Sequence, residues 1–239
     1  MTDAAPLTLS LAAGFLFGIK HALDPDHLVA VSTIVAEHKS LWRSSLAGIF
    51  WGIGHTITLA VVGLVVLGFK VTVPPALAHS LELIVGFMLV VLGLAVAVSL
   101  MREKVHLHRH EHDGYWHTHL HSHKHRPDHA HAHPDFGVYR PLFVGMVHGL
   151  AGSAALTVLV LSAMPSVLHG LFYLALFGLG SIVGMMAMST LIGSPFAYTA
   201  RRFERANLVI RTLASGTSIG LGLIIIAEMG SRLGLFPLR

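Results

Sequence analysis

The sequence predicts an all-α polytopic membrane protein, with six transmembrane helices arranged as two inverted three-helix repeats and a histidine-rich cytoplasmic loop between them. Hydrophobic residues make up 54% of the 239 residues and charged residues only 12%, about half the charged fraction of a soluble domain. Short glycine-containing motifs recur in the two halves, and most histidines lie between those halves. These features indicate a repeated membrane unit rather than a soluble globular domain.

Six apolar stretches, each about 20 residues or longer, are long enough to cross a bilayer. They lie at residues 7–36, 44–69, 76–101, 140–164, 167–194 and 207–235. The chain therefore divides into a first three-helix membrane repeat at 1–101, a histidine-rich flexible loop at 102–138 and a second three-helix membrane repeat at 139–239. We expect the first span to be retained, because the residues before it carry Asp3 and no lysine or arginine, unlike a cleavable signal peptide.

Basic residues predict the orientation of these spans. With six spans both termini lie on one side, which carries Lys70, Arg232 and Arg239. The opposite side carries Lys39, Arg43, Arg102, Lys104, Arg109, Lys124, Arg126, Arg140, Arg201, Arg202, Arg205 and Arg211. The positive-inside rule makes the richer side cytoplasmic and leaves the termini outside. We therefore expect a multi-pass protein of the cell (inner) membrane, whose basic residues set orientation in the lipid bilayer and do not bind nucleic acid.

The two halves share short motifs at similar offsets. Residues 18–23, Gly-Ile-Lys-His-Ala-Leu, match residues 145–150, Gly-Met-Val-His-Gly-Leu. Residues 51–55, Trp-Gly-Ile-Gly-His, match residues 177–181, Phe-Gly-Leu-Gly-Ser. A repeat of three helices enters the membrane from opposite sides in its two copies, so the second copy is inverted. Inverted repeats place substrate sites near the midplane, on interrupted helices at the repeat interface.

The first span contains two histidines, two aspartates and a proline within seven residues: His21, Asp24, Pro25, Asp26 and His27. An unpaired charge at the bilayer centre costs about 2.5 to 3.5 kcal/mol, so something must compensate these groups. Pro25 removes a backbone donor and disfavours the α region at Asp24, which predicts a helix break. A break would let the four polar side chains converge on one cation. A structural turn with satisfied polar groups is the alternative.

Further candidate ligands are His55 in the second span and His148 in the fourth. Imidazole nitrogens and carboxylate oxygens suit first-row divalent ions such as Ni2+, Co2+ and Zn2+, and the absence of cysteine excludes thiolate sites. A buried histidine bonded to a neighbouring helix is the alternative for each. Glu82 and Glu228 lie toward the outer ends of their spans, where they either line the mouth of an ion path or are simply solvated.

Twelve histidines lie in the 28 residues of the loop from 106 to 133. They are His106, His108, His110, His112, His117, His119, His121, His123, His125, His129, His131 and His133. So few apolar residues cannot form a packed core, so we expect a segment that is flexible without metal and chelates ions at several sites. It would hold arriving ions, pass them to a chaperone, or sense excess and gate the pore.

Residues 18–27 together with Gly54-His55-Thr56 resemble the nickel/cobalt transporter family, whose signature is a histidine, four residues, and then Asp-His in an early transmembrane helix. His21, Asp26 and His27 fall on that signature. The chain resembles the short six-helix branch related to the urease-associated transporters, since longer members have eight helices. The resemblance implies Ni2+ or Co2+ as the transported substrate and no organic cofactor. Its partners would be a cytoplasmic nickel chaperone or urease and hydrogenase maturation proteins.

We therefore expect a Ni2+/Co2+ transporter and not an enzyme. Uptake is favoured, because an inside-negative potential drives a divalent cation inward by about 4.6 kcal/mol per 100 mV. Asp26 also stands where the related exporters tend to have glycine. Efflux with a metal-sensing loop is the alternative. Weaker alternatives are a membrane di-iron oxygenase, whose histidines would lie at the cytoplasmic surface, and a metal store that acts through the loop alone.

Overall fold

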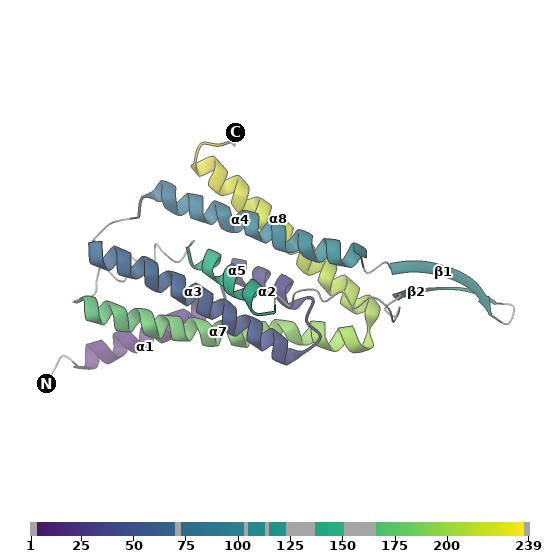
Figure 1. Cartoon of the computed structure of the whole chain (residues 1–239), viewed down its shortest axis with the longest axis horizontal. Coiled ribbons are helices and arrows are strands. Elements are labelled where there is room, and N and C mark those ends of the chain that lie inside the picture. Colours follow the sequence, from purple (N-terminus) through teal and green to yellow (C-terminus); the bar gives the residue numbers. More distant parts are fainter. Residues whose placement is uncertain are drawn as a thin grey trace.

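The computed structural model describes residues 4–69, 73–102, 105–112, 115–122, 137–150 and 166–236. In chain order the elements are α1 (Ala4–His21), α2 (Pro25–Val35), α3 (Leu41–Phe69), α4 (Pro75–Arg102), β1 (Val105–His112), β2 (Tyr115–Ser122), α5 (Tyr139–Leu150), α7 (Val167–Arg202) and α8 (Glu204–Arg232) (Figure 1). Apart from the two strands, the elements of the described residues are helices, as the predicted fold class requires.

Four of the helices, α3, α4, α7 and α8, are long and apolar enough to cross a membrane. They correspond to the predicted spans at 44–69, 76–101, 167–194 and 207–235. The predicted span at 140–164 begins in α5, which ends at Leu150, and residues 151–164 lie outside the described residues. The six-span count therefore remains a prediction, while four continuous spans agree with the structure.

The first predicted span is interrupted at the position that Pro25 indicates. α1 ends at His21 and α2 begins at Pro25, whose missing backbone donor is tolerated at the first helical position. Asp24, just before the proline, has φ −62° and ψ 141°, the extended conformation expected before a proline. The predicted break is thus confirmed, and it turns the histidines of the two helices toward a common region.

Helices from the two halves of the chain pack against each other. α1 packs on α7, α5 packs on α3, α3 packs on α7, and α4 packs on α8. The short helix α2 contacts α3, α4, α7 and α8 and lies between the α3/α7 and α4/α8 pairs (Figure 1). Its residues Ala30, Val31, Ile34 and Val35 are almost fully buried. The residues that follow the break are therefore held in the centre of the bundle.

Glycines at matching positions of the two halves make matching helix contacts. A Cβ at Gly18 of α1 would overlap the carbonyl oxygen of Phe177 in α7, and a Cβ at Gly145 of α5 would overlap that of Trp51 in α3. Gly18 matches Gly145 in the sequence, and Trp51 matches Phe177. Small residues of this kind let helix backbones approach closely in a membrane bundle.

The same correspondence holds in the reverse direction. A Cβ at Gly54 of α3 would overlap the carbonyl oxygen of Leu142 in α5, and a Cβ at Gly180 of α7 would overlap that of Phe15 in α1. Phe15 and Leu142 each lie three residues before the glycine of their own helix. At both crossings, α1 with α7 and α3 with α5, each helix therefore brings a glycine directly onto the backbone of its partner.

Part of the histidine-rich loop forms a two-stranded antiparallel sheet, which the sequence-based prediction did not include. β1 and β2 pair from Val105 opposite Ser122 to His112 opposite Tyr115, and the ribbon projects beyond the helices (Figure 1). The alternation of histidine with other residues has the period of a strand, and Asp113-Gly114 is a sequence typical of a two-residue hairpin turn. Backbone pairing between the two strands holds this sheet together, so it does not need a packed apolar core.

Candidate metal centre

His27, near the start of α2, is the central residue of a histidine cluster. It is 2% exposed, and its ring centroid lies 4.5 Å from that of His21, 5.3 Å from that of His55 and 4.4 Å from that of His148. These side chains come from α1, α2, α3 and α5. The break between α1 and α2 thus gathers ligands that lie on four separate helices.

One possible ligand group consists of His21, His27 and His55, with one nitrogen of each lying within 4.8 Å of the others. The Nε2 atoms of His21 and His55 are 3.1 Å apart. His55 is fully buried and His21 is partly buried. Two ring nitrogens that face each other at this distance can share a proton or converge on a cation.

A second possible ligand group consists of Asp26, His27 and His148 and has the same compactness. Nε2 of His148 lies 2.8 Å from Oδ2 of Asp26, although the two residues are 122 positions apart in the sequence. His148 is 2% exposed. The two groups share His27, so they are adjacent positions in one centre.

Asp24 lies behind His21 and belongs to neither group. Its Oδ2 is 2.8 Å from Nδ1 of His21, the opposite side of the ring from His55. A carboxylate can only accept, so Nδ1 of His21 donates to Asp24, and in the neutral ring Nε2 carries the lone pair. This is the arrangement in which an outer carboxylate fixes the tautomer and orientation of a metal-binding histidine.

Several buried polar atoms of the cluster have no hydrogen-bond partner among the described residues. They are Nδ1 of His27, His55 and His148, and Nε1 of Trp51. Buried polar groups are nearly always satisfied, so these four atoms leave unused hydrogen-bonding capacity around the cluster. A set of imidazole nitrogens and one carboxylate oxygen fits a first-row divalent ion.

Aromatic rings enclose the cluster. Trp51 of α3 lies with its ring centroid 5.4 Å from that of His27 and 5.7 Å from that of His148, and Phe177 of α7 lies 5.6 Å from His21. Trp51 is 1% exposed. From the sequence, Trp51 and Phe177 were noted only as parts of the repeated motif. Each is the first residue of its copy of that motif, and this correspondence is the signal that could have placed both beside the histidines.

The remaining predicted residues lie elsewhere. Within the described part of the chain, Glu82 and Glu228 join neither ligand group, and Glu228 pairs with Arg232 at 2.6 Å between Oε1 and Nη2. His123, His125, His129, His131 and His133 of the loop lie outside the described residues.

Seven loop histidines stand on the two strands. Three pairs of them are directly opposite in the backbone register: His106 and His121, His108 and His119, and His110 and His117. The seventh, His112, is opposite Tyr115. Because residues two apart in a strand occupy the same face, the backbone assigns all seven to one face of the ribbon.

The loop between α2 and α3 carries an ion pair and a buried imidazole outside the spans. Nη1 of Arg140 lies 3.4 Å from Oε2 of Glu37, which ties this loop to the start of α5. Burial, and to a lesser degree the charge of Arg43, lower the pKa of His38 below its ordinary value, against an opposing effect of Glu37. His38 is therefore uncharged near neutral pH.

Comparison with known proteins places this architecture among membrane proteins. Residues 10–224 match the family model described as the cytochrome C biogenesis protein transmembrane region. The urease accessory protein UreH of Bacillus sp. (strain TB-90) is 40% identical over 236 residues, covering 99% of this chain and 98% of that protein.

More distant similarity extends to two plant proteins. The chloroplast proteins FOR GROWTH AND FERTILITY 1 and 2 of Arabidopsis thaliana are 29% and 27% identical, over 89% and 90% of this chain. The chain spans 57% and 55% of their respective lengths. No solved structure matches the chain.

Proposed function

The chain belongs to the family of the cytochrome C biogenesis protein transmembrane region, and within this family of membrane proteins we propose that it carries Ni2+ or Co2+ across the bilayer. Its expected relationship to the urease-associated proteins is confirmed by the full-length match to a urease accessory protein. Because the chain contains no cysteine, it cannot itself carry out thiol chemistry. Its function must use nitrogen and oxygen donors.

The observation that carries the proposal is the pair of ligand groups that share His27 at the helix break. Ionisable groups in the middle of a membrane bundle are costly and are typical of ion pathways. An ion that moves from the group with His55 to the group with His148 keeps His27 as a ligand throughout. The step between the two positions therefore never requires complete loss of protein ligands, which lowers its barrier.

The donors of each group lie close enough to meet one ion after small side-chain movements. The Nε2 atoms of His21 and His55 are 3.1 Å apart, and Nε2 of His148 lies 2.8 Å from Oδ2 of Asp26. Imidazole nitrogens together with a carboxylate oxygen suit first-row divalent ions, which supports Ni2+ or Co2+ as the substrate.

We infer that the two halves act as inverted repeats around this centre. Gly18 and Gly145 make equivalent contacts with their partner helices, and so do Gly54 and Gly180. This equivalence supports a pseudo-twofold relation between the two halves. His148 then occupies the position of His21, and Ser181 that of His55. Transporters of this kind expose a central site to each side in turn, by movement of one repeat against the other.

We assign inward transport, with the termini outside the cell membrane and the ribbon in the cytoplasm. The membrane potential alone is sufficient to drive a divalent ion in this direction. The name of the urease accessory relative supports delivery of the ion to the urease maturation proteins. The single variants Thr2→Cys and Thr118→Cys test the orientation, because the chain has no native thiol. In intact cells, a membrane-impermeant thiol reagent should label Thr2→Cys and leave Thr118→Cys unlabelled.

Flux into proteoliposomes tests the proposed function. Purified protein is reconstituted with a metal-sensitive dye inside, and Ni2+ or Co2+ is added outside under an inside-negative potential. We expect rapid quenching with the wild type and almost none with the double variant His21→Ala/Asp26→Ala. His79→Ala is the matched control, since His79 of α4 belongs to neither ligand group. Absence of Ni2+ and Co2+ flux in both directions would defeat the proposal, and flux only outward would assign efflux instead.

A further inference from the structure

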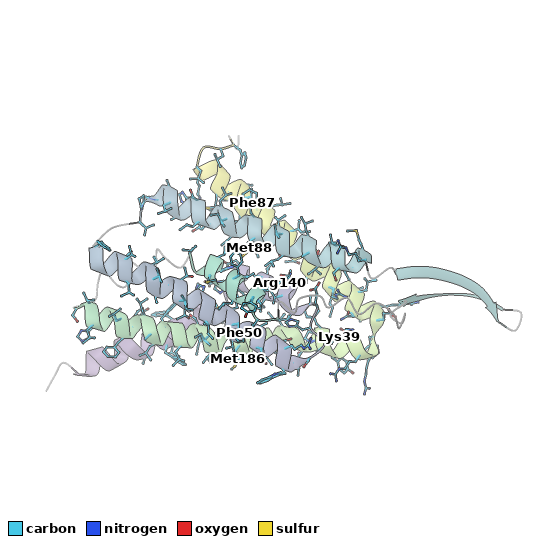
Figure 2. The ribbon with its side chains drawn as sticks, viewed as in Figure 1. Lys39, Phe50, Phe87, Met88, Arg140 and Met186 are labelled. Atoms are coloured by element: carbon cyan, nitrogen blue, oxygen red, sulfur yellow. The ribbon has the colours of Figure 1, made fainter. Side chains whose placement is uncertain are left out.

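A cavity of about 850 Å³ lies where the start of α3 meets the end of α7, apart from the histidine cluster. Residues 39–42 form one wall, and residues from Ser194 to Arg202 form the other. Lys39 lies toward the end of the molecule from which the ribbon projects (Figure 2). The cavity therefore opens at the end that carries most of the basic residues.

The lining of this cavity is positively charged. Lys39, Arg201 and Arg202 contribute to it, and none of its lining residues is acidic. Nη2 of Arg201 donates to the backbone carbonyl of Lys39 at 3.4 Å, which joins the two walls. The cavity thus gathers cationic groups without a carboxylate in its walls.

Two aromatic side chains complete the site. Trp42 is 69% exposed and Tyr198 is 57% exposed, and both line the cavity. Amphipathic rings of this type are enriched where a bilayer meets water. Since α3 and α7 are candidate spans, their ends at Leu41 and Arg202 lie at the depth of lipid headgroups.

From these observations we propose that the cavity binds the phosphate of an anionic phospholipid. Arginine presents a planar fork of donors that matches two phosphate oxygens, and lysine adds a point charge. Basic pockets between transmembrane helices bind anionic headgroups in this way. A free phosphate carries the same charge, but only a lipid also places acyl chains against Trp42 and Leu41, which is 47% exposed.

Native mass spectrometry of the full chain in detergent tests this assignment. The probes are phosphatidylglycerol and phosphatidylcholine with identical acyl chains. We expect retention of phosphatidylglycerol by the wild type and affinity lower by roughly 30-fold in Arg201→Gln/Arg202→Gln. The control Arg102→Gln/Arg205→Gln removes the same charge from residues that do not line the cavity, and it should bind as the wild type does. Lys39→Gln, which loses a single charge, should weaken binding by about fivefold.

Three results would overturn the assignment: equal retention of the two lipids, equal loss in the control, or displacement of phosphatidylglycerol by millimolar inorganic phosphate. The last result would identify a site for soluble phosphate. If the double variant fails to elute as a monodisperse particle, Lys39→Gln carries the comparison alone. No transition metal is present in this measurement, so its outcome is independent of the proposed transport.

Discussion

The histidine cluster around His27 and the histidine ribbon of β1 and β2 present the same side chain in two different settings. The cluster draws its candidate ligands from four helices, with His21 and His148 lying 127 positions apart in the sequence, and each is placed by helix packing. The ribbon repeats one pair of opposed histidines along two adjacent strands. The cluster thus provides few positions of fixed geometry, whereas the ribbon provides many equivalent ones. If both bind metal as proposed, selectivity would belong to the cluster and capacity to the ribbon.

The largest effect should come from His27→Ala, which breaks the cluster at its shared ligand. Because both groups lose a donor, we expect metal flux into proteoliposomes to fall by more than about 100-fold, beyond what loss of an outer-sphere partner causes. His55→Ala and His148→Ala each leave one group intact and should retain more flux than His27→Ala. Equal loss in all three variants would contradict two successive positions and would favour a single site.

Asp24→Asn should have the next largest effect. The amide cannot hold the neutral His21 ring with the strength of a carboxylate, so we expect the concentration for half-maximal flux to rise by about 10-fold to 100-fold. The metal content per molecule at saturation should stay unchanged. If the number of bound ions falls instead, Asp24 is a ligand and its placement behind His21 has been misread.

Gly18→Ala tests whether the cluster depends on the helix crossings. The added methyl group overlaps the carbonyl of Phe177, so overpacking should cost about 1 to 3 kcal/mol in the free energy of unfolding. Thermal unfolding in detergent measures the loss. Gly216→Ala is the matched control, because among the described residues no atom outside the neighbouring backbone of its own helix lies within 4 Å of the Cβ position. This variant should leave stability unchanged or raise it slightly. The same cost in both variants would argue against the crossing.

Deletion of residues 104–135 should have the smallest effect on transport. The cluster lies on other elements, so we expect initial flux to stay within about threefold of the wild type while calorimetry shows far fewer Ni2+ ions bound per chain. Complete loss of flux would make the ribbon an obligatory part of the ion path. Complete loss of nickel handling in cells, with unchanged flux into proteoliposomes, would instead identify a metal store.

The features that could be predicted from the sequence depend on the chemistry of single residues and their immediate neighbours. Pro25 identified the helix break. The residue types of His21, Asp26, His27, His55 and His148 singled out the candidate ligands that the fold brings together. The role of Asp24 depended on which side of the His21 ring it faces, and the enclosure by Trp51 depended on the crossing of α3 and α5. Neither contact can be predicted from the spacing of residues along a single helix. The strands of the loop were missed because low apolar content was given more weight than alternation with a period of two.

The interruption between α1 and α2 has an electrostatic consequence of its own. Each helix carries a macrodipole, so the end of α1 at His21 presents about half a negative elementary charge to the cluster and the start of α2 about half a positive one. Asp26, in the first turn of α2, offsets the positive end. A cation that enters the cluster as proposed would therefore meet the negative end of α1 without an opposing charge from α2, and this attraction persists in any protonation state of the histidines.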